Sequence, residues 1–251
     1  MKRVGLLLIV LCLLSELSCR KNDNPGLSGN GIDYSNQSVG ASAHDLLSPE
    51  KYALLKIEIQ YMPGFQPDAG SVSNLSSFLN GIVNKPGGIQ ITEKQIPAFG
   101  NTTLSLTQVE AIEKQYRTVY TNNTQSGVYF LFTDGNYTDN SVLGVSYRNT
   151  SVCLFGKTIH DNSGAIGQTS RATLESAVME HECGHILGLV NTGSPMQIPH
   201  EDPSHAHHCN NQNCLMYYAM ETTDMLGFLS GGTIPALDAN CLADLKANGG
   251  K

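Results

Sequence analysis

Two histidines four residues apart have the spacing of metal ligands. His181 and His185 lie in a segment with helical periodicity, residues 169–187. A spacing of four places both imidazoles on one helix face, one turn apart, where they can share one ion. Glu182 follows His181, and its carboxylate could accept a proton from a water molecule that the ion has acidified. The segment therefore predicts a zinc site for hydrolysis, with Glu182 as the general base.

The sequence HECGHILG, from His181 to Gly188, resembles the metzincin zinc metallopeptidases. In that clan a glycine turns the chain after the helix, so that a third ligand three residues further on reaches the metal. Asn191 stands at this position here. An amide is a poor zinc ligand compared with an imidazole or a carboxylate. We therefore expect the third ligand elsewhere in the chain.

A second stretch, from His208 to Tyr217, is similar to the segment between the third histidine and the methionine turn of matrixins and archaemetzincins. The resemblance implies that His208 is the third ligand, that Met216 forms the floor under the metal, and that residues 191–207 are an insertion. It also implies that Tyr218 stabilises the oxyanion. Ordinary packing is the alternative for Met216 and Tyr218. The alternatives for the third ligand are the other histidines of this region, His200, His205 and His207.

Cysteine usage leaves the number of metal ions open. Archaemetzincins hold a second zinc ion with cysteines, and Cys209 and Cys214 match the first two of them. Only Cys241 represents the later Cys-x-x-Cys pair of that family. We expect a Cys209–Cys214 disulfide as the simpler outcome outside the cytoplasm, and Cys153–Cys241 is a further conceivable pair. Cys183 is expected to be a small buried side chain.

The elements that must position these groups can be read from hydrophobic periodicity. The pattern predicts strands at 54–61, 89–96, 128–132, 141–147 and 150–155, and helices at 71–83, 106–120, 169–187 and 235–247. This order, with a loop-rich last quarter, predicts an α/β (α+β) domain. The resemblance implies a metzincin-like twisted mixed sheet, a long catalytic helix and a small loop-rich C-terminal subdomain. It also implies that residues 142–147 form an edge strand that pairs with an extended substrate.

The N-terminus predicts export. Lys2 and Arg3 precede an apolar run, residues 4–14, that is too short to span a bilayer. The following Ser-Cys at residues 18–19 resembles a bacterial lipoprotein signal. We expect a signal peptide at 1–19 with a lipidated Cys19, a flexible tether at 20–48, and a zinc metallopeptidase domain at 49–251. The protein would then be lipid-anchored to a bacterial (outer) membrane or secreted.

Net charge narrows the classes of partner. The formal net charge is −7, and no basic cluster offsets it. This argues against nucleic acid or an anionic membrane surface as the main partner. We expect a monomeric zinc endopeptidase that acts on protein or peptide substrates and meets the membrane only through a lipid anchor. A non-catalytic zinc-binding surface lipoprotein and a zinc hydrolase of a non-peptide cell-wall amide are the alternatives.

Overall fold

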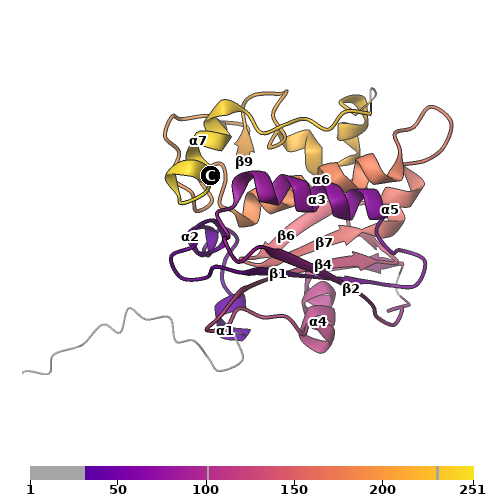
Figure 1. The fold of residues 1–251 in the computed structure, drawn as a ribbon. Helices are drawn as coiled ribbons and strands as arrows, with labels where there is room; N and C mark the ends of the chain where they lie inside the picture. The colour runs from indigo at the N-terminus through magenta and orange to yellow at the C-terminus, as the bar shows by residue number, and fades with distance from the viewer. Residues whose placement is uncertain (1–31, 101, 230–231) are drawn as a thin grey trace, which may run out of the picture.

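Five strands form a twisted mixed sheet at the centre of the structure (Figure 1). The structure is a computed structural model that describes residues 32–100, 102–229 and 232–251. The strands lie in the order β2 (Ile89–Gln95), β1 (Leu55–Tyr61), β4 (Ser126–Thr133), β7 (Ser151–Phe155) and β6 (Gly144–Arg148). The first four are parallel, whereas β6 runs antiparallel to β7 and forms one edge of the sheet. The predicted α/β class with a mixed sheet is confirmed.

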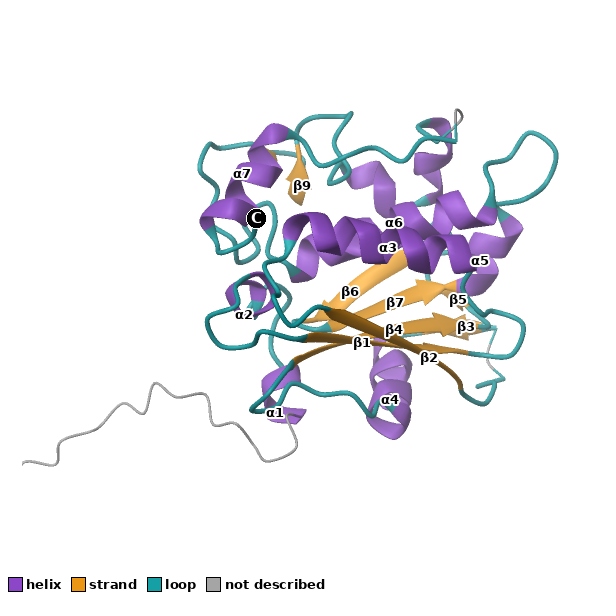
Figure 2. Ribbon diagram, in the orientation of Figure 1, coloured by secondary structure: helices purple, strands orange, loops and turns teal. Residues whose placement is uncertain are grey.

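Helices cover both faces of this sheet (Figure 2). Helices α3 (Ala69–Ile82) and α6 (Arg171–Ile186) lie on one face, and α4 (Leu106–Tyr116) lies on the other. Because both faces are covered, every residue of the central strand β4 is buried. The hydrophobic core therefore has two parts, one beneath α3 and α6 and one beneath α4.

Helix α6 runs through the interior rather than along the surface. Ser170 caps its N-terminus, because the Ser170 hydroxyl accepts a hydrogen bond from the Thr173 amide at 3.1 Å. Every residue from Leu174 to Ile186 is buried, so this stretch has no solvent-facing side. Its histidines and glutamates are consequently held in a low-dielectric environment, where polar groups need specific partners.

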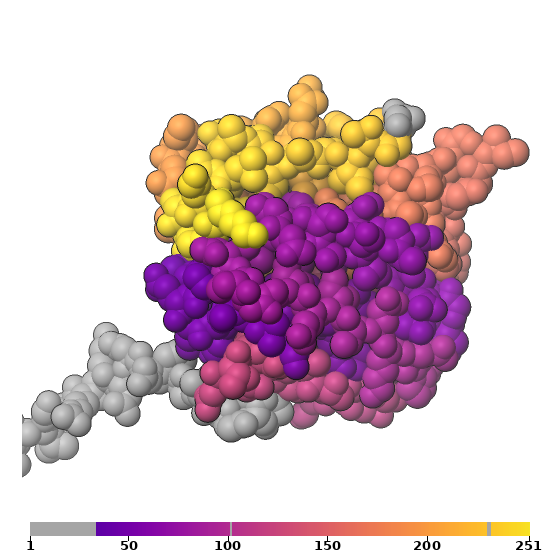
Figure 3. All heavy atoms as spheres, viewed as in Figure 1, coloured from indigo at the N-terminus to yellow at the C-terminus, as the bar shows by residue number. Residues whose placement is uncertain are grey.

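The last quarter of the chain lies over α3 and α6 (Figure 1). It contains a hairpin and a helix, together with two 3-10 turns: β8 (Glu201–Asp202), β9 (His205–Cys209), η1 (Tyr218–Glu221), η2 (Thr223–Gly227) and α7 (Ala239–Ala247). Helix α7 begins after the predicted residue 235, because the Asp238 carboxylate accepts a hydrogen bond from the Cys241 amide and caps the helix there. The C-terminal end, drawn in yellow, lies against the purple atoms that include α3 (Figure 3). The Lys251 amide donates to the Ile82 carbonyl at the end of α3.

The remaining elements are short. They are α1 (Ile32–Ser35), α2 (Ala43–Leu47), β3 (Thr103–Leu104), β5 (Asn136–Tyr137) and α5 (Gly156–Asp161). All the longer predicted strands and helices are present with ends shifted by a few residues. Within the described part of the chain, no helix combines the length and apolar character needed to cross a membrane.

The segment predicted as a tether, residues 20–48, is folded in its second half. The predicted signal, residues 1–19, and the first half of the tether lie outside the described residues. In α2, the side chains of Leu46 and Leu47 are buried in the core beneath α3 and α6. The tether prediction is therefore wrong for this part, because two leucines supply an apolar anchor that the polar composition conceals.

One side chain from the sheet holds this N-terminal segment in place. Asn149 follows β6, and its Nδ2 donates hydrogen bonds to the Tyr34 carbonyl at 2.8 Å and to the Ser42 hydroxyl at 2.6 Å. Its Oδ1 accepts from the Gln37 amide at 3.2 Å. Together with the backbone bond from the Asn149 amide to the Gln37 carbonyl at 3.1 Å, these side-chain bonds hold the segment beside the end of β6.

Candidate metal centre

Helix α6 delivers two imidazoles and a carboxylate to one buried site. His181 and His185 lie one turn apart, and their Nε2 atoms are 3.1 Å from each other. Both rings are buried, as is the side chain of Glu182. The spacing of four residues therefore places both imidazoles on one face of α6, as the sequence predicts.

A third imidazole comes from strand β9. The ring centroid of His208 lies 5.5 Å from that of His181 and 5.0 Å from that of His185. The strand is positioned by the methionine turn, because the Cys209 amide donates to the Met216 carbonyl at 2.8 Å. Three imidazoles from two distant parts of the sequence thus converge on one point.

Backbone carbonyls fix which ring nitrogens face that point. The Nδ1 atom of His181 lies 2.7 Å from the Leu215 carbonyl, and the Nδ1 atom of His208 lies 3.0 Å from the Ala206 carbonyl. A carbonyl only accepts, so each Nδ1 carries the hydrogen and each Nε2 keeps its lone pair. The Nε2 of His208 has no hydrogen-bond partner among the described residues. These lone pairs are directed as metal ligands require.

The spacing and charge state of the imidazoles fit zinc. Four ligands about 2.1 Å from a tetrahedral zinc ion lie roughly 3.4 Å from one another, close to the 3.1 Å between the Nε2 atoms of His181 and His185. Burial, with the nearby His208, lowers the pKa of His181 to about 4, and burial also lowers the pKa of His185 well below its ordinary value. Both rings are therefore neutral at pH 7, which is the form that binds a metal ion.

Ser146 orients the carboxylate of Glu182. Its hydroxyl lies 2.8 Å from both Glu182 Oε2 and the Glu182 carbonyl, and each of these oxygens can accept its hydrogen. The other oxygen, Oε1, is buried without a partner among the described residues. Burial, together with the charge of Glu221, raises the pKa of Glu182 to about 8. A carboxylate with a pKa near neutrality is a stronger base than an exposed one.

Replacement of Ser146 by alanine is expected to lower kcat by about 10- to 100-fold, the usual effect of losing a group that orients a functional side chain. Zinc affinity should stay unchanged, because Ser146 touches no imidazole of the cluster. Steady-state kinetics with zinc titration checks both points. Ser141→Ala is the matched control, because the Ser141 hydroxyl bonds only to exposed Asp139. Equal kcat values for the two variants would show that Ser146 does not position Glu182.

Met216 packs directly beneath helix α6. A Cβ atom placed on Gly184 would lie 2.2 Å from Met216 Sδ, so only glycine permits this approach between His181 and His185. Met216 itself is fully buried. The methionine lies under the imidazole cluster, where the resemblance placed it.

A cavity of about 480 Å³ opens above the imidazoles. Its lining includes Ser146, Glu182, His185, His208 and Glu221. Strand β6 forms one wall and lies close against α6, because a Cβ on Gly144 would meet Val178 Cγ1 at 2.5 Å. The sequence did not single out Ser146 or Glu221. One signal could have pointed to Ser146: side chains alternate in the predicted edge strand, so Ser146 lies on the same face as Gly144.

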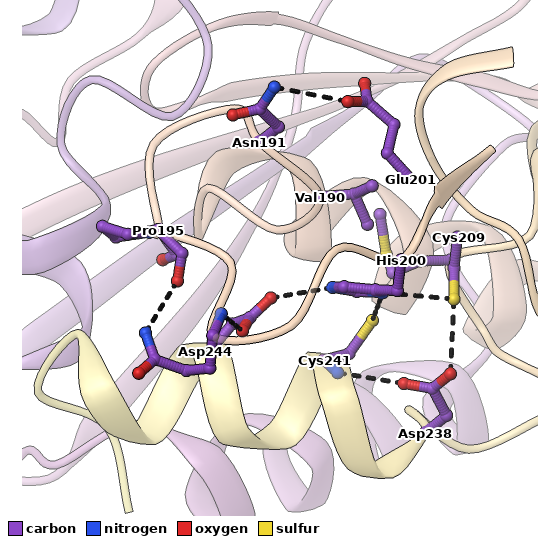
Figure 4. A network of polar contacts seen from close by, with 12 residues as sticks. Val190, Asn191, Pro195, His200, Glu201, Cys209, Asp238, Cys241 and Asp244 are labelled. Atoms are coloured by element: carbon purple, nitrogen blue, oxygen red, sulfur yellow. Dashed lines mark hydrogen bonds and ion pairs between the residues drawn. The ribbon is translucent and has the colours of Figure 1, made fainter. Parts of the chain in front are cut away.

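The other predicted residues of this region are not members of the imidazole cluster, although Asn191 and His207 line the same cavity. The ring of Tyr218 stacks on that of His205, with centroids 3.6 Å apart, and His205 Nδ1 lies 2.9 Å from Asp202. His207 is largely exposed. Asn191 donates to the Glu201 carboxylate at 3.3 Å, a bond that joins the first residue of the insertion to strand β8 (Figure 4). The oxyanion role of Tyr218 stays a prediction.

His200 lies in a second buried cluster, together with cysteines (Figure 4). His200 Nδ1 is 3.4 Å from Cys209 Sγ and 3.9 Å from Cys241 Sγ. Its Nε2 lies 2.8 Å from the Asp244 carboxylate, which accepts the ring hydrogen and leaves the Nδ1 lone pair facing the sulfurs. The Asp238 carboxylate, 3.3 Å from Cys209 Sγ, completes this group of metal-binding side chains. Cys214 lies beside the group, with its Sγ 3.7 Å from Cys241 Sγ.

The five described cysteines are free thiols, so the expected Cys209–Cys214 disulfide and the conceivable Cys153–Cys241 pair are both absent from the described structure. Cys153 belongs to the core beneath α4, whereas Cys241 belongs to the core beneath α3 and α6, and the sheet separates them. The distances within the second cluster instead suit a metal. Sulfurs bound about 2.3 Å from a tetrahedral zinc ion lie roughly 3.8 Å apart, close to the 3.7 Å between Cys214 and Cys241.

A larger hollow, about 630 Å³, lies between α3, α6 and residues 232–237. Its walls are mainly apolar, and Glu180 is the buried carboxylate that faces it. It contains none of the histidines of the imidazole cluster. Of these two cavities, the smaller one is lined by members of the imidazole cluster.

Two solved structures are similar to this chain at low sequence identity. No protein-family model matches the chain, and no curated protein matches it. Archaemetzincin from Methanopyrus kandleri is similar in structure, with 14% identity, a TM-score of 0.47, and coverage of 80% of this chain and 98% of that one. Metalloproteinase-II from Bacteroides fragilis is similar with 12% identity, a TM-score of 0.44, and coverage of 90% and 58%. Similarity at this level does not assign an activity, so the function is inferred from the side chains of the site.

Proposed function

We propose that this protein is a zinc-dependent endopeptidase with His181, His185 and His208 as the metal ligands. The observation that carries the proposal is the convergence of three imidazoles beside a buried, oriented carboxylate. Three neutral nitrogen ligands with an adjacent general base are the donor set of catalytic zinc sites.

In this proposal the metal ion and the side chains of the protein have separate roles in hydrolysis. A zinc ion held by the three imidazoles supplies a Lewis acid that polarises a peptide carbonyl and acidifies water. Glu182 accepts the proton of the attacking water and passes it to the nitrogen of the leaving amine. Ser146 keeps the Glu182 carboxylate turned into the cavity throughout. The carboxylate ends the cycle as it began, so no further proton donor is needed.

Strand β6 provides the surface for an extended substrate. It is the edge strand beside the cavity, and its outer backbone groups face away from β7. A peptide that adds to this edge gains backbone hydrogen bonds without regard to its side chains. We therefore propose protein or peptide substrates that bind in extended form.

Hydrolysis assays on three substrate classes test the proposal against its alternatives. Zinc-loaded protein should cleave a casein-like protein, and chelation should stop the cleavage. Cleavage of peptidoglycan alone would favour the cell-wall amidase. Stoichiometric zinc without turnover of protein, peptidoglycan or a synthetic ester would favour a binding lipoprotein.

We further propose that the second buried cluster holds a structural zinc ion through His200, Cys209 and Cys241, with Cys214 rather than the neighbouring Asp238 carboxylate as the fourth ligand. Thiolate and imidazole are ligands that zinc prefers, and four protein ligands are typical of a structural site. An ion here would join the insertion, the methionine turn and α7. It would also keep three thiols reduced if the protein is exported and lipid-anchored, as its N-terminus predicts.

Cys241→Ser is expected to reduce the zinc content from two ions per chain to one and to lower the urea midpoint of unfolding. The loss of stability follows because a structural ion binds only the folded chain. Cys153→Ala is the matched control, because Cys153 lies in the core beneath α4. Elemental analysis with urea titration checks both variants. Two zinc ions per chain in Cys241→Ser would exclude this site.

A further inference from the structure

Glu221 lies at the fourth corner of the imidazole cluster. One carboxylate oxygen of Glu221 and one nitrogen of each imidazole all lie within 4.8 Å of one another. The Oε2 atom of Glu221 is 3.5 Å from His208 Nε2, close to the roughly 3.4 Å that separates two ligands of a tetrahedral zinc ion. The carboxylate therefore lies where a fourth ligand belongs, rather than in a hydrogen bond with the ring.

The backbone of Glu221 is held by the sheet. Its carbonyl accepts a hydrogen bond from the Leu143 amide at 2.8 Å, and the Thr223 amide donates to the Ser141 carbonyl at 2.8 Å. Between these bonds, Val142 and Thr222 form an antiparallel bridge. The segment 221–223 thus occupies the edge of the sheet just before β6, as a peptide would.

We propose that Glu221 is a fourth ligand of the metal, and that residues 221–223 are a latch that an extended peptide must displace. The inference rests on the proposed zinc site and adds a ligand to it. A catalytic zinc site keeps one position free for water or substrate, whereas four protein ligands close it. With Glu221 bound, the centre is closed and Glu182 has no water to deprotonate.

Substrate binding and opening of the centre are coupled through the same backbone groups. A peptide that pairs with β6 and continues past Gly144 needs the Leu143 amide, which now donates to Glu221. Forming that new bond breaks the old one and frees Glu221 to leave the imidazole cluster. Long extended peptides therefore open the centre, and ligands too short to reach Leu143 compete directly with the carboxylate.

Cobalt substitution with acetohydroxamate as the probe tests the latch. Acetohydroxamate is a small metal chelator that cannot reach Leu143. We expect Glu221→Ala and Glu221→Gln to bind it at least about tenfold more tightly than the natural protein, because no protein ligand has to leave first. The visible absorption of bound cobalt should also differ between these variants and the natural protein before the probe is added. Asp224→Asn is the control, because Asp224 is exposed beyond the latch.

Two outcomes overturn the inference. Equal probe affinity in all four proteins, with identical cobalt spectra, would show that Glu221 is no ligand. Failure of the natural protein to bind cobalt at the imidazoles would overturn the zinc site as well, which separates the two proposals. Because Glu221→Gln preserves the shape of the side chain, it keeps the test valid if the alanine variant does not fold.

Discussion

Replacement of Glu182 by alanine is expected to lower peptide hydrolysis by about 100- to 10,000-fold, which is the range for loss of a general base. The Glu182 carboxylate is fully buried and oriented by Ser146. Among the described residues, Glu221 is the other carboxylate that lies beside the imidazoles. Zinc should still bind with one ion at the imidazoles, because the three ring nitrogens are untouched. Initial rates on a casein-derived peptide, measured on protein of known zinc content, check both expectations.

The matched control for this experiment is Glu180→Gln. Glu180 is buried in the same turn of α6 but faces the larger hollow. Its substitution should leave the rate within about twofold, the effect expected of a residue remote from the chemistry. Hydrolysis by Glu182→Ala at the rate of Glu180→Gln would mean that Glu182 is not the base.

Replacement of His208 by alanine is expected to weaken zinc binding at the imidazole cluster by more than about 100-fold, since even groups that only support a ligand contribute 10- to 100-fold. His208 supplies the one ring that comes from outside α6, and its Nε2 has no other hydrogen-bond partner among the described residues. Two imidazoles and Glu221 would remain, so the site would lose one of its proposed ligands and bind zinc more weakly. Competition with a fluorescent zinc chelator measures the affinity, and hydrolysis should fall with it.

His207→Asn provides the control for this second prediction, because asparagine tolerates the left-handed backbone of this residue, whose φ is 67°. His207 directly precedes His208 in the sequence, but its side chain is 56% exposed. Zinc affinity should be unchanged within about threefold, as for an ordinary surface substitution. Comparable losses of zinc affinity in the two variants would mean that His207, alone or together with His208, supplies the third ligand.

The catalytic helix was predictable because its signal is local. A run of helical periodicity with two histidines at a spacing of four defines a ligand pair without knowledge of the rest of the fold. The strands and helices followed the predicted segments closely for the same reason, whereas the edge position of β6 was implied only by the resemblance, and the sheet order was not predicted. His208 required the resemblance, because no local rule joins it to residues that precede it by more than twenty positions.

Side chains that meet only through the tertiary structure escaped the sequence analysis. Ser146 bonds to Glu182 across 36 positions, and Glu221 reaches the imidazoles from a 3-10 turn without periodicity. Burial of Leu46 and Leu47 beneath the helices was equally hidden, because two apolar residues within a polar segment give no periodic pattern. The cysteines illustrate the same limit, since spacing alone could not reveal that His200 would lie among them.

Anomalous X-ray scattering at the zinc edge, on crystals of the natural protein, tests the central claim most directly. The account predicts a strong peak within about 2.1 Å of the Nε2 atoms of His181, His185 and His208, the length of a zinc–nitrogen bond. A protein that crystallises from zinc-containing solution with no peak among these three rings would contradict it.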